Sequence, residues 1–354
     1  MSKPACKEKL RNLFNLLKPV SVMLLVQVGI AGADILSKLA LYDGMNSQVM
    51  VAYRFLFAAG FTIPFALFMD RNISPKPKLT WTVIGQAFLC GLLGGSLLLT
   101  LLMESLVLTT VTFVAAMSNL LPPITFILAV CFRLESVSLK KLPAIAKVLG
   151  SLLGMAGAML MTFYKGVQIK LWTTNIHLPN VPSGASSHKH DGLNLVWGTL
   201  LALGSCLSFA AWLIVQVKLS NNYPSPYATT ALMSLMGCVQ AVVFALCVEH
   251  DWQEWKLGWD IRLLAVAFSG IFGSGVLVAL TTWCNNVKGP LFVSIFSPVT
   301  LVVAALVGSL MLNDKLYLGS VLGAIVIVLG LYAVIWGKSK EEDPKTGDRV
   351  VSTE

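Results

Sequence analysis

The first long apolar segment of the sequence carries three polar or charged side chains that could contact a solute. Gln27, Asp34 and Lys38 are separated by seven and four residues, so a helix places them on one stripe. A charge at the middle of a bilayer costs ~3 kcal/mol, and such residues usually face a cavity or pair with one another. Asp34 and Lys38 form an i, i+4 pair that can partly neutralise itself. The stripe predicts a cavity wall that binds a carboxylate or an amine. The alternative is that Lys38 reaches the membrane interface and the pair only orients the helix end.

A second polar stripe lies in the sixth apolar segment. It consists of Ser205, Ser208, Trp212 and Gln216. A wall of hydroxyl, indole and amide groups suits a small polar solute, whereas the alternative is hydrogen bonding between helices, which is modest in membranes. Arg54, early in the second apolar segment, predicts either an interface anchor or a residue that contacts substrate or acts in gating.

Prolines interrupt two apolar segments at matching places. Pro122 and Pro123 donate no backbone N–H, so the carbonyl groups of two preceding residues lose their usual partners. Pro298 has the same effect in the ninth segment. With Asn119, the freed carbonyls predict a polar spot at mid-membrane that binds a ligand or lets the helix bend. The alternative is a structural kink, which is common in membrane helices.

The composition excludes most other functions. Hydrophobic residues make up 56% of the 354 residues and charged residues 12%, with a mean hydropathy of +0.77. The class is therefore an all-α polytopic membrane protein. The net charge of +9 follows from the preference of Lys and Arg for cytosolic loops and does not indicate nucleic-acid binding. The four His lie in expected loops, the seven Cys show no CxxC or zinc spacing, and HExxH, P-loop and GxSxG motifs are absent from the sequence. We expect no enzyme, no metal and no cofactor.

Ten membrane helices are predicted. Their ranges are 19–40, 47–69, 80–102, 106–130, 143–164, 193–217, 227–248, 261–283, 290–312 and 317–336. They form two five-helix units, 19–164 and 193–337, which are separated by a polar loop at 165–192. The remaining parts are an N-terminal segment, 1–18, and a charged tail, 338–354, that is expected to be disordered after Lys338.

The two units repeat each other at an offset of 179 residues. Phe113-Val114 corresponds to Phe292-Val293, and Gly91 to Gly270. A five-helix unit crosses the membrane an odd number of times, so its copy is inverted. Placing both termini in the cytosol puts 18 Lys and Arg on the cytosolic face and 6 outside. The sequon at Asn72 is then cytosolic and should be unmodified. Glycines at GxxxG spacing, such as Gly150 with Gly154, predict close helix contacts.

These residues resemble a known family. The first half of the resemblance is carried by Gln27, Ala31-Gly32, Lys38, Gly44-Met45, Ala52-Tyr53-Arg54, Pro64-Phe65-Ala66, Thr112-Phe113, Met117, Asn119-Leu120-Leu121-Pro122, Thr125-Phe126 and Phe132-Arg133-Leu134-Glu135. The second half is carried by Trp212, Gln216, Tyr223-Pro224, Gly237, Gln240, Lys288-Gly289-Pro290 and Phe292-Val293. The sequence is similar to the plant EamA-type transporters of the Walls-Are-Thin-related (nodulin-like, UMAMIT) group, in the drug/metabolite transporter superfamily. Pro123, where a small residue is usual, and Glu104, where aromatic neighbours are expected, depart from the pattern.

The resemblance implies ten helices in two inverted EamA repeats around a central cavity. It also implies movement of amino acids across plant membranes, often as export, with at least one relative linked to auxin at the vacuole. We expect a secondary carrier or facilitator of amino acids or similar solutes that works by alternating access. Its predicted location is the plasma membrane in preference to the vacuolar membrane.

Several points stay open from the sequence. A carrier of auxin or another small metabolite is one alternative, and a non-transporting receptor or scaffold is another. The expected partners are a small-molecule substrate and membrane lipid, with no nucleic acid. Because no ATP-binding motif is present, a gradient must drive net transport, and proton coupling is one option. The sequence identifies neither a proton acceptor nor an oligomeric state.

The predicted substrate residues are Lys38, Asn119, Trp212, Gln216, Gln27 and Asp34, and the predicted gating residues are Pro122, Pro123, Pro298 and Arg54.

Overall fold

The computed structural model describes residues 3–72, 79–108, 117–134, 142–164, 168–169, 192–223, 225–303 and 316–342. This part of the chain is helical, apart from turns and one two-residue strand pairing. Within it, eight helices are long and apolar enough to cross a membrane, and two apolar helices are shorter. The prediction of a polytopic helical membrane protein is therefore confirmed.

The first half contains four of the long helical runs and one of the short helices. Its elements are α1 (Lys3–Tyr42), α2 (Ser47–Met69), the 3-10 turn η1 (Asp70–Asn72), α3 (Trp81–Gly91), the π-helical η2 (Leu92–Ser96), α4 (Leu97–Leu108), α6 (Leu121–Cys131), α7 (Leu142–Phe163) and β1 (Gln168–Ile169). Asn46 caps α2 by accepting a hydrogen bond from the backbone N–H of Gln48, which explains why that helix begins where it was predicted.

The second half contains the other four long helical runs and the other short helix. Its elements are α8 (Gly192–Asn222), α9 (Pro226–Val248), α10 (Ile261–Phe268), the π-helical η3 (Ser269–Leu277), α11 (Val278–Lys288), α12 (Pro290–Ile295), β2 (Leu316–Tyr317) and α14 (Leu318–Glu342). The Ser225 hydroxyl caps α9 by accepting from the backbone N–H of Ala228. β1 pairs with β2 in antiparallel register, Gln168 opposite Tyr317, which the all-helical prediction did not include.

Several predicted boundaries need correction. The first helix begins at Lys3 instead of residue 19, because the polar N-terminal segment is rich in good helix formers even though it is not apolar. The last helix continues to Glu342, so the expected disorder after Lys338 is wrong for those residues. The segments predicted as 80–102 and 261–283 each contain a π-helical stretch at glycine-rich sequence. Such stretches are frequent at functional sites.

Each of the two proline-containing segments carries a turn near its prolines. A turn at Asn119 and Leu120 precedes α6, and a turn at Phe296 separates α12 from a helical stretch that runs to residue 303. Residues 109–116 and 304–315 lie outside the described part, and residues 106–108 belong to the end of α4. Within the described residues, the helix predicted at 106–130 is broken at Asn119 and Leu120, whereas the helix predicted at 290–312 is found as an apolar helical run from Pro290 to Val303 with one turn residue, Phe296.

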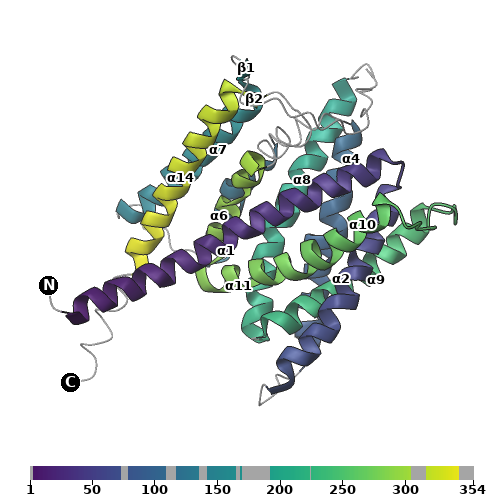
Figure 1. Cartoon of the computed structure of the whole chain (residues 1–354), viewed down its shortest axis with the longest axis horizontal. Helices are drawn as coiled ribbons and strands as arrows, with labels where there is room; N and C mark the ends of the chain where they lie inside the picture. Colours follow the sequence, from purple (N-terminus) through teal and green to yellow (C-terminus); the bar gives the residue numbers. More distant parts are fainter. Residues whose placement is uncertain are drawn as a thin grey trace.

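Three pairs of packed helices each join the first half of the chain to the second. α2 packs on α9, α6 on α12, and α7 on α14. Figure 1 shows α7 and α14 side by side at one edge of the molecule, with α1 crossing beside α11 and α10. Glycines allow the α7–α14 contact, because a Cβ atom at Gly157 would lie 2.9 Å from the carbonyl oxygen of Gly323.

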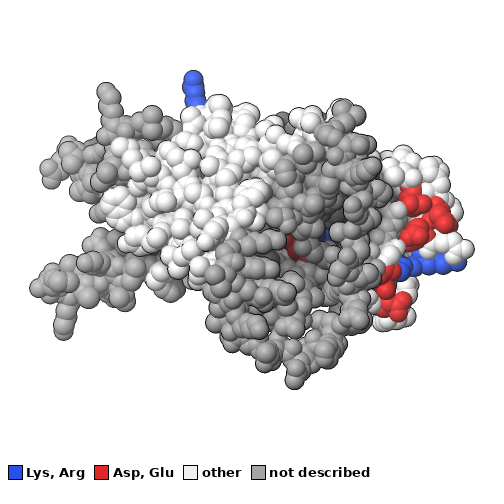
Figure 2. All heavy atoms as spheres, turned by 90° about the horizontal axis from the view of Figure 1, so that it is seen from above, with Lys and Arg blue, Asp and Glu red and all other residues white. Residues whose placement is uncertain are grey.

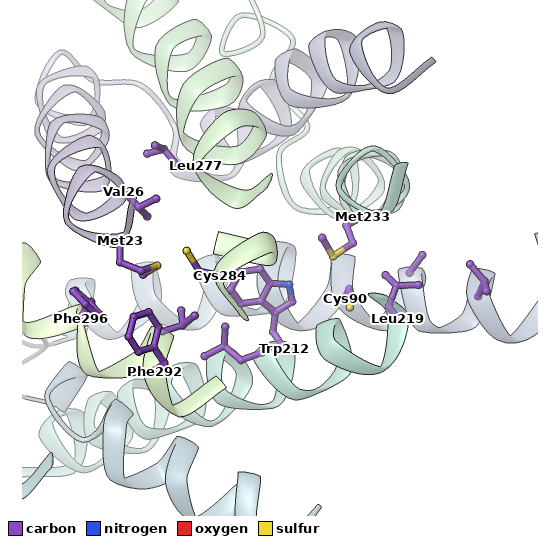
Figure 3. Packing of buried hydrophobic residues seen from close by; sticks show 14 residues of the cluster. Met23, Val26, Cys90, Trp212, Leu219, Met233, Leu277, Cys284, Phe292 and Phe296 are labelled. Atoms are coloured by element: carbon purple, nitrogen blue, oxygen red, sulfur yellow. The ribbon is translucent and has the colours of Figure 1, made fainter. Parts of the chain in front are cut away.

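The main buried cluster lies where helices of both halves meet. Figure 3 shows side chains from α1, α3, α8, α9, η3, α11 and α12 pointing toward a common centre, with Trp212 in the middle of the view. Met23, Cys284 and Phe296 are fully buried there. Several of its members, among them Met23, Trp212 and Leu277, also line the cavity described below.

Candidate functional site

A central cavity of about 270 Å³ lies between the two halves of the chain. Its walls come from α1, α2, the α3–η2–α4 run, α6, α8, α9, the η3–α11 run and the helix that follows Phe296. Figure 2 shows the molecule hollowed on its upper side, with an acidic and a basic side chain visible inside the hollow. Among the described lining residues, Asp34 and Arg54 are the charged ones.

The charged part of the cavity is built by α1, α2 and η3. The Nε atom of Arg54 donates a 2.8 Å hydrogen bond to the Ser274 hydroxyl, which orients the guanidinium beside the cavity. Asp34 interacts electrostatically with Arg54. The π-helical stretch leaves room for this arrangement, since a Cβ atom at Gly273 would lie 3.3 Å from Arg54 Nη2. The site therefore combines an anion and a cation within one space.

Another part of the cavity wall is aromatic and closely packed. Trp212 is 6% exposed, and its ring packs edge-on against Phe209 with 5.2 Å between ring centroids. Gly94 of η2 lies against this indole, because a Cβ atom there would come within 2.5 Å of Trp212 Cγ. Both aromatic rings line the cavity. They offer an apolar surface in the same cavity that Asp34 and Arg54 line.

Gln27 lines the cavity from α1 and is hydrogen-bonded. Its side-chain oxygen accepts from the hydroxyl of Thr300, which belongs to the helical stretch after Phe296. The contact ties the first helix to the broken ninth segment. Thr300 was not predicted, and neither was Ser274. A threonine or serine in an apolar helix is too common to mark a site.

Gln216 is placed outside the described cavity lining. It is fully buried and belongs to a polar network between α8 and α11. Its Nε2 atom donates to the Thr282 hydroxyl at 2.6 Å, and its Oε1 atom accepts from Asn285 Nδ2 at 2.8 Å. Asn285 also donates to the carbonyl of Leu213. Gln216 thus links two helices by hydrogen bonds, which was the alternative interpretation of the polar stripe on α8. Trp212, from the same stripe, contacts the cavity.

Asn119 and the prolines form the broken part of the fourth segment. Asn119 is 2% exposed, lies in the turn before α6, and is not among the described lining residues. Within the described part of the chain, its Nδ2 atom has no hydrogen-bond partner. Pro122 and Pro123 occupy the first turn of α6, where a backbone N–H has no helical partner anyway.

A side-chain hydrogen bond beside Pro298 replaces one backbone hydrogen bond that the proline removes. The sequence predicts that this proline frees the carbonyl group of Ser294. In the structure, the Ser297 hydroxyl donates to that carbonyl oxygen, and Ser297 also lines the cavity. The interruption is thus stabilised locally. The side chain of Lys38 lies outside the described part, so the predicted Asp34–Lys38 pair stays a prediction.

One end of the helix bundle is held together by contacts between connecting segments and helix ends. Arg262, in the first turn of α10, forms a salt bridge with Asp43 at 2.7 Å, and Asn46 donates to Glu249 at 2.6 Å. Tyr53 of α2 donates its hydroxyl hydrogen to the backbone oxygen of Trp255. These contacts join α2 and the α1–α2 connection, from the first half, to α10 and the segment before it, from the second. Acidic side chains gather at this edge of the molecule (Figure 2).

A polytopic helical protein with a cavity at the junction of its halves has the architecture of a membrane transporter. The chain belongs to the EamA-like transporter family, which matches it twice, at residues 17–163 and 196–336. The resemblance stated from the sequence is confirmed. These comparisons indicate a transporter rather than an enzyme.

The relatives are plant proteins of similar length. WAT1-related protein At1g68170 of Arabidopsis thaliana is 44% identical over 92% of this chain and 91% of its own. WAT1-related protein At1g25270 of the same plant is 42% identical over the same shares of the two chains. A protein of known crystal structure, 16% identical, superposes with a TM-score of 0.63 over 90% of this chain and 96% of its own. That last match concerns the fold alone.

Proposed function

We propose that this protein is a secondary carrier or facilitator of amino acids or closely related small organic solutes. Family membership supports transport of a small molecule across a membrane. The observation that carries the finer proposal is that Asp34 and Arg54, which carry opposite charges, both line one central cavity. An amino acid at neutral pH has an ammonium and a carboxylate, so it can contact both charges at once.

The energetic argument favours a substrate with both charges. Each ionised group at mid-membrane costs ~2.5–3.5 kcal/mol on insertion scales, so such residues mark solute pathways. A simple carboxylate such as auxin would gain from Arg54 but be repelled by Asp34. An amine would have the opposite problem. A zwitterion satisfies both groups, and its side chain can lie against Trp212 and Phe209.

Alternating access follows from the same architecture. The cavity is bordered by both halves, and the broken helices α6 and α12 pack against each other beside it. In carriers built from inverted repeats, one half rocks against the other around a site near the membrane midplane. The gating role of Pro122, Pro123 and Pro298 would be to let the broken helices change angle during this motion. We place the protein in the plasma membrane with both termini cytosolic, on the basis of the charge distribution and the resemblance.

The experiment is counterflow in proteoliposomes that contain the purified protein. A panel of labelled neutral, acidic and basic amino acids is compared with auxin, at equal and at unequal pH across the membrane. Neutral amino acids are expected to move faster than in empty liposomes. If auxin moves and amino acids do not, the proposed substrate is wrong and auxin takes its place. If no solute moves although the protein is folded, the receptor or scaffold alternative is favoured. Stimulation by an inward proton gradient would support proton coupling.

A further inference from the structure

A second space lies outside the central cavity, on the side of the bundle near the start of the apolar part of α1. It is a groove of about 450 Å³ between α1, α2, α9 and the η3–α11 run. Figure 1 shows α11 beside α1, and α2 packs on α9. The groove therefore lies where helices of the two halves meet.

The wall of the groove is apolar. Phe61 and Phe65 stack with 5.7 Å between ring centroids, and Tyr227 packs edge-on against Phe65 at 5.5 Å. The two threonines in the wall, Thr62 and Thr230, are buried and donate their hydroxyl hydrogens to carbonyl groups of their own helices. Their hydrogen atoms are therefore not available to a polar ligand. Such a wall suits a hydrocarbon chain.

The mouth of the groove is cationic and aromatic. The Lys18 ammonium lies 5.3 Å from the centroid of the Trp283 ring, within the range of a cation–π interaction. Lys18 is exposed, and Tyr227 is 40% exposed. Tryptophan, tyrosine and lysine together line this groove, a combination that is typical of the membrane–water interface.

We propose that this groove binds one anionic phospholipid, with an acyl chain along the apolar wall and the phosphate at Lys18. Charge complementarity and depth both favour this occupant, because one end of the groove is positive while the rest is apolar. The N-terminal end of α1 is predicted to face the cytosol, where the leaflet carries the anionic lipids. The lipid would touch helices from both halves, so it would stabilise their association whatever solute the central cavity carries.

The test counts bound lipid by native mass spectrometry of the purified protein in non-ionic detergent. Dioleoyl phosphatidylserine is titrated against wild type and Lys18→Gln, and dioleoyl phosphatidylcholine serves as the neutral lipid. One basic residue near an anionic headgroup contributes ~1 kcal/mol, so affinity for the first phosphatidylserine should fall about fivefold. Lys18→Arg, which keeps the charge, should retain the affinity.

The chain offers a matched control for the charge. Lys218 is also exposed and also lies over an aromatic ring, Phe132, at 4.5 Å, but it does not line the groove. Lys218→Gln should leave the first phosphatidylserine bound as tightly as in wild type. Equal losses in the two glutamine variants would show diffuse attraction to the surface and overturn the proposal.

A second pair of variants tests the groove itself. Ala279→Trp places a large ring in the groove and should lower the affinity for the first phosphatidylserine at least as much as Lys18→Gln does. Val243→Trp, on an exposed part of α9 outside the groove, should have no such effect. Unchanged binding in Ala279→Trp, or equal affinity for the two lipids in wild type, would also overturn the proposal.

Discussion

Replacement of Gly94 by alanine should damage the central cavity through a collision with Trp212. The added Cβ atom would lie 2.5 Å from Trp212 Cγ and Nε1, where ordinary contacts are 3.4–4 Å. The indole must therefore move by about 1 Å. It is 6% exposed, packs against Phe209 and lines the cavity, so a shift of the ring must disturb either that packing or the cavity wall. Overpacking of this kind costs ~1–3 kcal/mol.

The assay combines thermal unfolding in detergent with substrate counterflow. A loss of ~1.4 kcal/mol in the arrangement that binds substrate lowers the apparent affinity about tenfold. Gly85→Ala is the matched control on α3, because no neighbouring atom lies within 4 Å of the place that its Cβ would occupy. It should be neutral, or stabilising by up to ~1 kcal/mol. Adding Trp212→Leu should relieve the strain of Gly94→Ala, giving a coupling of ~1 kcal/mol or more. If Gly94→Ala unfolds and transports like Gly85→Ala, the reasoning is refuted.

Three further changes test other parts of the account. Gln216→Leu removes the hydrogen bonds between α8 and α11 and leaves their polar partners buried, so the free energy of unfolding in detergent should fall by ~1–3 kcal/mol. A variant as stable as wild type would contradict the role of this network. Gly157→Ala should destabilise the α7–α14 contact by ~1–3 kcal/mol in the same assay. Gly154→Ala should not, because no neighbouring atom lies within 4 Å of the place that its Cβ would occupy. Equal stabilities of the two variants would argue against the α7–α14 packing. Lys38→Ala should reduce counterflow of the substrate in folded protein, and undiminished flux would remove this residue from the substrate path.

The sequence predicted the membrane helices best where apolar composition and a capping residue agree. α2 was predicted as residues 47–69 and is found as Ser47–Met69, with Asn46 as its cap. The start of α1 was missed because a hydropathy argument detects the apolar part of a helix and not its polar extension. The turn at Phe296 lies two residues before Pro298, and a proline in a sequence does not by itself distinguish a kink from a full interruption.

The candidate site could be predicted only in part. Gln27, Asp34, Arg54 and Trp212 line the cavity. Helical spacing had placed Gln27 and Asp34 on one stripe and Trp212 on another, whereas Arg54 was predicted as an interface anchor or as a substrate or gating residue, and the substrate roles stay predictions. Gln216 shares a stripe with Trp212, yet it bonds to a neighbouring helix, because periodicity gives the face of a helix and not the partner that the face meets. The Arg54–Ser274 contact joins residues 220 positions apart and depends on the π-helical stretch, which local sequence patterns do not predict.

The most direct test of the central claim is the charge preference of transport when each charged residue is removed in turn. Counterflow of a neutral amino acid, its N-acetyl derivative and the corresponding amine is measured in proteoliposomes with wild type, Asp34→Asn and Arg54→Gln. Wild type should prefer the zwitterion. Asp34→Asn should lose the preference over the N-acetyl anion, and Arg54→Gln the preference over the amine. If folded Asp34→Asn and Arg54→Gln both keep the wild-type preference, or if wild type moves all three compounds equally, the pair does not recognise the substrate.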